Sequence, residues 1–274
     1  MTGLAVIARL TLREAARRRI LVLAFLLGLL FVGLYALGLH LMLPDISQSL
    51  LFRHRVLKLF FLLGLYAVNF LTVAMSILTS VDTLAGEIRS GTIQTLAAKP
   101  VARWQILLGK WLGFAGMLTV YIALMAGGVA ATTYLLGGFW SPALFTAMAL
   151  IWLEGLILLS VTFLGGTMLS TLATGVLAIG LHGLAFLGGW IEEFGSYAAS
   201  KTSVSIGIVT GLIIPSESLW RRAAYEVHHP IIGGPGMGPF TSDSVPSNAM
   251  VLYAVIYGLV ALSLAVYRFE RRDL

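Results

Sequence analysis

Six apolar stretches, each long enough to cross a lipid bilayer, constrain this chain more than any other feature of its sequence. They cover residues 20–43, 59–80, 111–136, 142–169, 172–191 and 249–267. A helix that spans the hydrocarbon core needs about 20 apolar residues, and every backbone polar group must be satisfied inside it. We therefore expect an all-α polytopic membrane protein with six transmembrane helices, built as one domain over residues 1–274.

The composition agrees with this class and excludes several others. Hydrophobic residues make up 58% of the chain and charged residues 11%, whereas a soluble domain carries about 25% charged residues. An ordinary soluble enzyme, a disordered chain and a nucleic-acid-binding protein are excluded, and the lipid bilayer is the expected surrounding. The chain has no cysteine, so disulfides, thiolate catalysis and cysteine-based metal sites are excluded as well.

Basic residues are unevenly distributed along the chain. Twelve of the 18 lysines and arginines fall in segments 1–19, 81–110 and 268–274, which share one side of a six-span chain. Cytoplasmic loops of membrane proteins are enriched in Lys and Arg, so both termini are predicted to be cytoplasmic. A smaller basic group around Arg53 runs against this bias.

The residues before the first span have a pattern of their own. Arg9, Arg13 and Arg17 recur every four residues and therefore share one face of a helix. Arg17 continues into Arg18 and Arg19, directly before the apolar stretch. This pattern predicts an N-terminal interfacial helix on the inner leaflet, with its basic groups at lipid phosphates. The alternative is a simple basic anchor that only sets the orientation.

The long connection before the last span, residues 192–248, is also unusual. Its apolar stretch 203–214 is too short to cross the bilayer, and Pro215 separates it from a short helical stretch at 216–227. Residues 232–247 are rich in Pro and Gly and predict a loop. We expect an outer re-entrant segment here.

The connection between the second and third spans is the most informative part of the sequence. Asp82 and Glu87 lie early in a helical stretch and Lys99 lies at its end, an order that complements the helix dipole. Pro100 then ends the helix, because the residue before a proline avoids the helical region. The pattern predicts a short cytoplasmic helix over 87–99, held between two spans and suited to transmit force from a docked partner.

This connection resembles that of the ABC-2 type permeases, the membrane subunits of one class of ATP-binding-cassette transporter. Within them it is most similar to the group that includes the permease of nitrous-oxide-reductase maturation. The matching residues are Glu87, Gly91, Thr92, Leu96, Pro100, Val101, Arg103, Gly109, Lys110 and Gly113. The opening R-L-T-L-R-E-A-A-R-R-R from Arg9 and the closing F-E-R-R-D-L also resemble the family's ends. Ala102 is a departure, because the family usually has Ser or Thr there.

The resemblance implies a permease subunit of an exporter in a prokaryotic cytoplasmic (inner) membrane, paired with a second permease, identical or paralogous. Residues 87–99 would be the coupling helix that docks on a separate ATPase, flanked by residues 1–19, while residues 192–248 would close the pathway outside. The coupling residues would be Glu87, Arg89, Gly91, Thr92, Leu96, Pro100 and Arg103. ATP and Mg would bind the ATPase, since Gly109-Lys110 lacks the other residues of a phosphate-binding loop. No cofactor and no enzymatic activity are expected on this chain.

Three polar residues lie deep in the apolar stretches, namely Glu154, Asn69 and His182. An ionisable residue at mid-membrane is costly and indicates function by default, so these residues are candidates for lining a pathway. The alternative is that they are neutral and hydrogen-bonded to neighbouring helices.

Two other functions stay open at this point. One is an ion- or proton-coupled secondary transporter. The other is an intramembrane hydrolase in which Ser160 or Ser170 pairs with His182 as nucleophile and base. His228, His229 and Met237 carry donors that suit copper, but their spacing favours loop residues without a metal.

Overall fold

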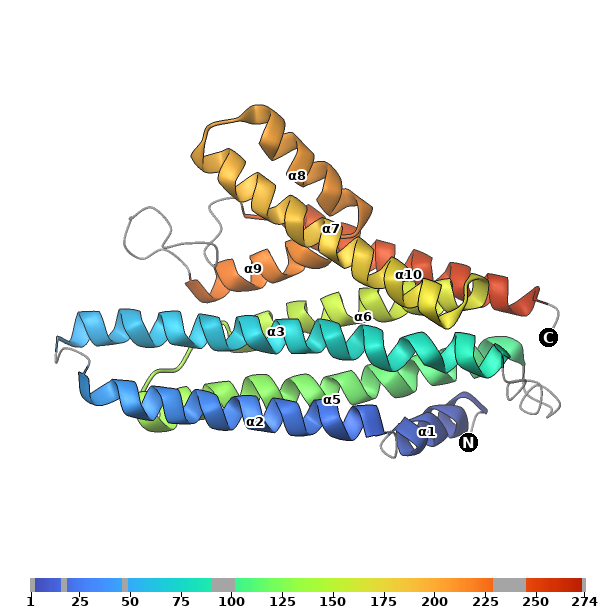
Figure 1. Ribbon diagram of the computed structural model, residues 1–274, viewed down its shortest axis with the longest axis horizontal. Helices are drawn as coiled ribbons and strands as arrows, with labels where there is room; N and C mark the ends of the chain where they lie inside the picture. Colours follow the sequence, from blue (N-terminus) through green and yellow to red (C-terminus); the bar gives the residue numbers. More distant parts are fainter. Residues whose placement is uncertain (1–2, 16–18, 46–48, 90–101, 229–244, 273–274) are drawn as a thin grey trace.

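The computed structural model describes residues 3–15, 19–45, 49–89, 102–228 and 245–272 (Figure 1). Regular structure in these ranges is helical throughout. The helices, with one short 3-10 turn η1 (Leu43–Asp45), are α1 (Gly3–Ala15), α2 (Arg19–Met42), α3 (Leu50–Arg89), α5 (Arg103–Gly137), α6 (Leu144–Met168), α7 (Thr171–Tyr197), α8 (Lys201–Ile213), α9 (Ser216–His228) and α10 (Asn248–Glu270).

The six predicted spans are confirmed as helices. Those long and apolar enough to cross a membrane are α2, α3, α5, α6, α7 and α10. Helices α8 and α9 pass the same test only together, and they are bent by 110° at the break that contains Pro215. The all-α polytopic class is therefore confirmed, and a sharply bent helix pair stands where the outer re-entrant segment was expected.

The second span is longer than predicted. The sequence pattern ends it at residue 80 and places Glu87 at the start of a separate helix over 87–99, but α3 continues without a break to Arg89. Its polar residues Ser76, Thr79, Ser80 and Thr83 each bond to the carbonyl oxygen four residues earlier. These bonds satisfy the hydroxyl groups inside the helix itself, so a polar stretch does not end it. Glu87 therefore belongs to α3.

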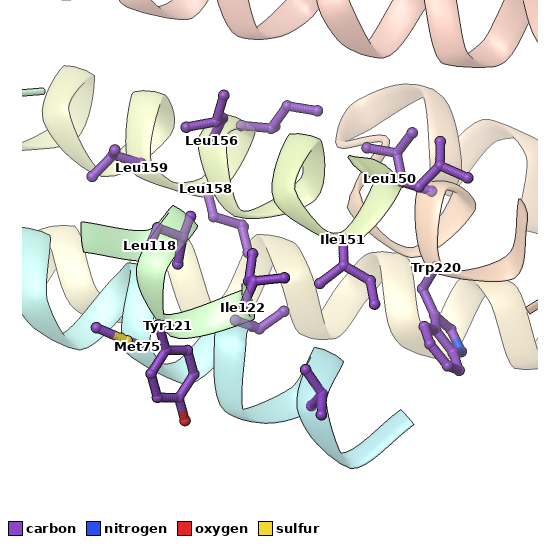
Figure 2. Close-up of a cluster of buried hydrophobic side chains, with 14 of the residues drawn as sticks. Met75, Leu118, Tyr121, Ile122, Leu150, Ile151, Leu156, Leu158, Leu159 and Trp220 are labelled. Atoms are coloured by element: carbon purple, nitrogen blue, oxygen red, sulfur yellow. The ribbon is translucent and has the colours of Figure 1, made fainter. Parts of the chain in front are cut away.

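The core lies between α3, α5 and α6. Figure 2 shows side chains of α5, among them Tyr121 and Ile122, beside Ile151 and Leu158 of α6. Trp220 of α9 joins the same cluster. In the apolar windows of α2 and α10 only 11% and 22% of the residues are buried. These two helices lie at the perimeter, where apolar side chains can face lipid.

Both termini lie at the same end of the bundle (Figure 1). Helix α1, the last turns of α3, the first turns of α5 and the end of α10 meet there. We call this the terminal end. Helix α7 runs away from the terminal end, and α8 returns beside it along most of its length (Figure 1).

Candidate functional site

Two glycines of α5 hold α1 against the terminal end. A methyl group at Gly109 would lie 2.8 Å from Cβ of Ile7, and one at Gly113 would lie 2.8 Å from Cβ of Thr11. The two helices therefore approach closely, as small residues allow between membrane helices. Ile7 and Thr11 are buried, whereas Arg9 and Arg13 are exposed on the other face of α1. One face of the predicted interfacial helix is thus docked on protein, and its basic face points outward.

A buried ion pair connects α3 to α5 at the same end. Nζ of Lys110 lies 2.7 Å from Oε1 of Glu87, and the two residues are 3% and 9% exposed. Glu87 lies near the last residue of α3, and Lys110 lies two turns into α5. Both belong to the pattern that resembles the ABC-2 permeases, and the fold brings the acidic residue and the later lysine of that pattern into contact.

The chain's C-terminal residues are tied to the start of α5. Nη1 of Arg103 donates to the carbonyl oxygens of Glu270 and Arg272, at 3.2 and 2.7 Å. Arg272 in turn donates from its guanidinium to the carbonyl oxygen of Thr167, at the end of α6. Charge-assisted bonds of this kind are stronger than neutral ones. They link α5, α6 and α10 across the terminal end.

The three stretches that carry the family resemblance therefore meet in space. Glu87 near the end of α3 and Arg103 at the start of α5 both take part in these contacts. The described residues of this site connect α1, α3, α5, α6 and α10 through packing, an ion pair and charge-assisted hydrogen bonds.

Some of the predicted coupling and basic residues lie outside the described residues. These are Arg17, Arg18, Gly91, Thr92, Leu96 and Pro100, together with the side chain of Arg89. Arg19 begins α2 and is exposed.

The deep polar residues form a second group at mid-bundle. Glu154 of α6 is fully buried, and its Oε1 lies 3.8 Å from Nδ1 of His182 on α7. Asn69 of α3 lies beside the same carboxyl group. The structure thus brings together three residues that the sequence indicated one by one. It adds Ser216 and Glu217, the first residues of α9.

This group does not have the geometry of a catalytic triad. Oγ of Ser216 lies 3.0 Å from Nδ1 of His182, the same nitrogen that Glu154 approaches. A triad needs the hydroxyl at one ring nitrogen and the carboxylate at the other. The two serines considered as nucleophiles are engaged elsewhere, because Ser160 bonds to Trp111 and to its own helix, and Ser170 caps α7. The predicted pairing of either serine with His182 is therefore wrong.

A second buried ion pair holds the bent helices in place. Both guanidinium nitrogens of Arg221 on α9 contact the carboxylate of Glu192 on α7, at 2.7 and 3.0 Å. Among the described residues no three side chains of His, Asp or Glu gather as a metal site. The copper hypothesis falls outside this part of the chain, since His229, Met237 and the side chain of His228 are not described.

These features define a multi-pass helical membrane protein whose terminal end is a set of linked helices. The family model described as "ABC-2 family transporter protein" matches residues 5–274, and the chain belongs to this family. It is therefore a transport component of the membrane. A search of curated proteins finds no match.

Proposed function

We propose that this chain is the transmembrane subunit of an ATP-binding-cassette exporter in a prokaryotic cytoplasmic membrane, with both termini in the cytoplasm. A separate ATPase chain binds ATP and Mg and docks at the terminal end, over segment 87–103. Closure of the ATPases moves this segment, and the movement reaches α3 and α5 and opens a path for an unidentified substrate.

The observation that supports this proposal most is the convergence at the terminal end. Glu87–Lys110 and the Arg103 contacts lie on either side of segment 90–101 in the sequence, so a partner bound there would act on α3, α5 and α10 at once. The proposal includes a second permease copy, identical or paralogous. Gly180 and Gly183 of α7 have open space where a side chain would stand, and small residues allow close approach of another helix.

Affinity purification from gently solubilised native membranes tests the proposed partner. A soluble chain with a phosphate-binding loop is expected to co-purify in stoichiometric amount. Co-purification of membrane proteins alone, under conditions that preserve a known complex of this class, would contradict the proposal and favour secondary transport.

A variant locates the docking site. We expect Arg103→Ala to lower the amount of co-purified ATPase, because the start of α5 loses its anchor beside segment 90–101. Arg222→Ala is the matched control, since Arg222 lies on α9 and pairs with Glu226. Equal loss of ATPase from both variants would show that docking does not depend on the terminal end.

The proposed orientation predicts a labelling pattern. The chain has no cysteine, so single cysteines can be introduced at Glu270, the last residue of α10, and at Ala198, which directly follows α7; both residues are exposed. A membrane-impermeant maleimide added to intact cells is expected to label the cysteine at 198. It should label the cysteine at 270 only after the membrane is permeabilised. The reverse pattern would place the termini outside.

A further inference from the structure

The buried carboxylates of the bundle differ in how they are compensated. Glu87 has Lys110 at 2.7 Å, and Glu192 has two bonds from Arg221. Glu154 is 0% exposed, and neither of its oxygens accepts a hydrogen bond from the part of the chain that is described. An ionised carboxylate without a partner is very costly away from water, so Glu154 needs a counter-charge or a proton.

The helices around Glu154 supply no counter-charge. From α9 it faces Glu217, a second buried carboxyl group that offers no positive charge. From α3 it faces Asn69, a neutral amide that carries no charge. The charged residues of α5 and α10 lie near the terminal end of those helices. The remaining titratable neighbour is His182 of α7, at 3.8 Å.

The tip of the bent pair closes this site. Ile214 and Ser216, on either side of Pro215, are both 0% exposed. The Ser216 hydroxyl is hydrogen-bonded to Nδ1 of His182, with 3.0 Å between Oγ and Nδ1. His182 is itself partly exposed, with 18% of its side chain accessible against 0% for Glu154. A proton on Glu154 can therefore leave through His182 once Ser216 withdraws from that nitrogen.

We propose that Glu154 is an intramembrane proton-binding site that the tip of α8–α9 closes and that exchanges its proton through His182. In the described conformation the carboxyl group carries its proton. When the tip moves, the O–H bond of Glu154 breaks and the proton bonds to Nδ1 of the neutral imidazole. The products are a carboxylate and an imidazolium, so the net charge of the pair is unchanged. The site does not depend on the proposed ATPase.

Infrared spectroscopy tests the protonation directly. The protein, purified with its associated subunits in lipid nanodiscs at neutral pH, is compared with Glu154→Gln. The difference spectrum is expected to contain the carbonyl stretch of a protonated carboxylic acid, which is separate from carboxylate bands. Glu192→Gln is the control and should remove carboxylate bands only. Absence of the acid band from the Glu154→Gln difference spectrum would overturn the proposal.

Thermal unfolding gives a second measurement. Glutamine resembles a neutral carboxylic acid in shape and charge, so Glu154→Gln is expected to lower the midpoint by less than half as much as Glu192→Gln, which removes the carboxylate that both guanidinium nitrogens of Arg221 contact. A larger decrease of the midpoint in Glu154→Gln would show that Glu154 is charged and compensated.

Hydrogen–deuterium exchange tests the role of His182. Transfer to D2O should shift the acid band more slowly in His182→Gln than in the unaltered protein. An unchanged rate would remove His182 from the exchange route.

Discussion

Replacing Lys110 by methionine is expected to destabilise the protein more than any other single change at the terminal end. Methionine keeps much of the side-chain volume but leaves the carboxylate of Glu87 buried without Lys110. Removal of one partner from a buried ion pair costs about 3–5 kcal/mol. The measurement is the thermal midpoint of the purified chain in one detergent, together with the fraction that elutes as a single species.

Two controls separate charge from packing in this experiment. The double variant Glu87→Gln with Lys110→Met should recover most of the loss, because no uncompensated charge is then buried. Glu226→Gln breaks the partly exposed pair with Arg222 and should cost about 0.3–0.5 kcal/mol. If the double variant is as unstable as Lys110→Met alone, the loss comes from packing and the ion-pair explanation is wrong.

Replacing Gly113 by leucine is expected to detach α1 from the bundle. Its Cβ would lie 2.8 Å from Cβ of Thr11 and 3.0 Å from the carbonyl oxygen of Ala8. Neither atom is the end of a flexible side chain, so the helices must separate. Overpacking of this kind costs about 1–3 kcal/mol. Limited trypsin digestion measures the result. Arg9 and Arg13 become cleavable when α1 detaches from α5 and unfolds.

Gly127 provides a matched control on the same helix. A side chain there meets nothing within 4 Å, so Gly127→Leu should leave cleavage at Arg9 and Arg13 unchanged. Gly113→Ala should give an intermediate rate. Equal cleavage of the Gly113 and Gly127 variants would mean that the attachment of α1 to α5 does not depend on the close contact at Gly113.

Much of the fold could be predicted from the sequence, because span length is fixed by the thickness of the bilayer. The ends of the spans were harder to predict. Hydroxyl groups such as those of Ser80 and Thr83 are polar in any hydropathy average, yet they bond to their own helix. The extension of α3 to Arg89 therefore has no signal in composition.

The contacts of the candidate sites could be predicted only in part. The family pattern indicated Glu87 and Lys110 separately, but their contact depends on how α3 and α5 pack side by side. Asn69, Glu154 and His182 were each found because polar groups are rare in spans. Glu217 escaped notice because an acidic residue in the first turn of a helix is ordinary. Only the bend at Pro215 brings it to the bundle interior.

The length of α3 has a mechanical consequence. Its 40 residues extend for about 60 Å at about 1.5 Å per residue, roughly twice the thickness of the hydrocarbon core. Such a helix acts as a stiff rod, and a rod that tilts about its middle moves its two ends in opposite directions. Asn69 lies near that middle. The polar group around Glu154 is therefore beside the part of α3 that such a tilt displaces least. A change in the tilt angle of α3 then displaces the helix at both membrane faces at once, in opposite directions.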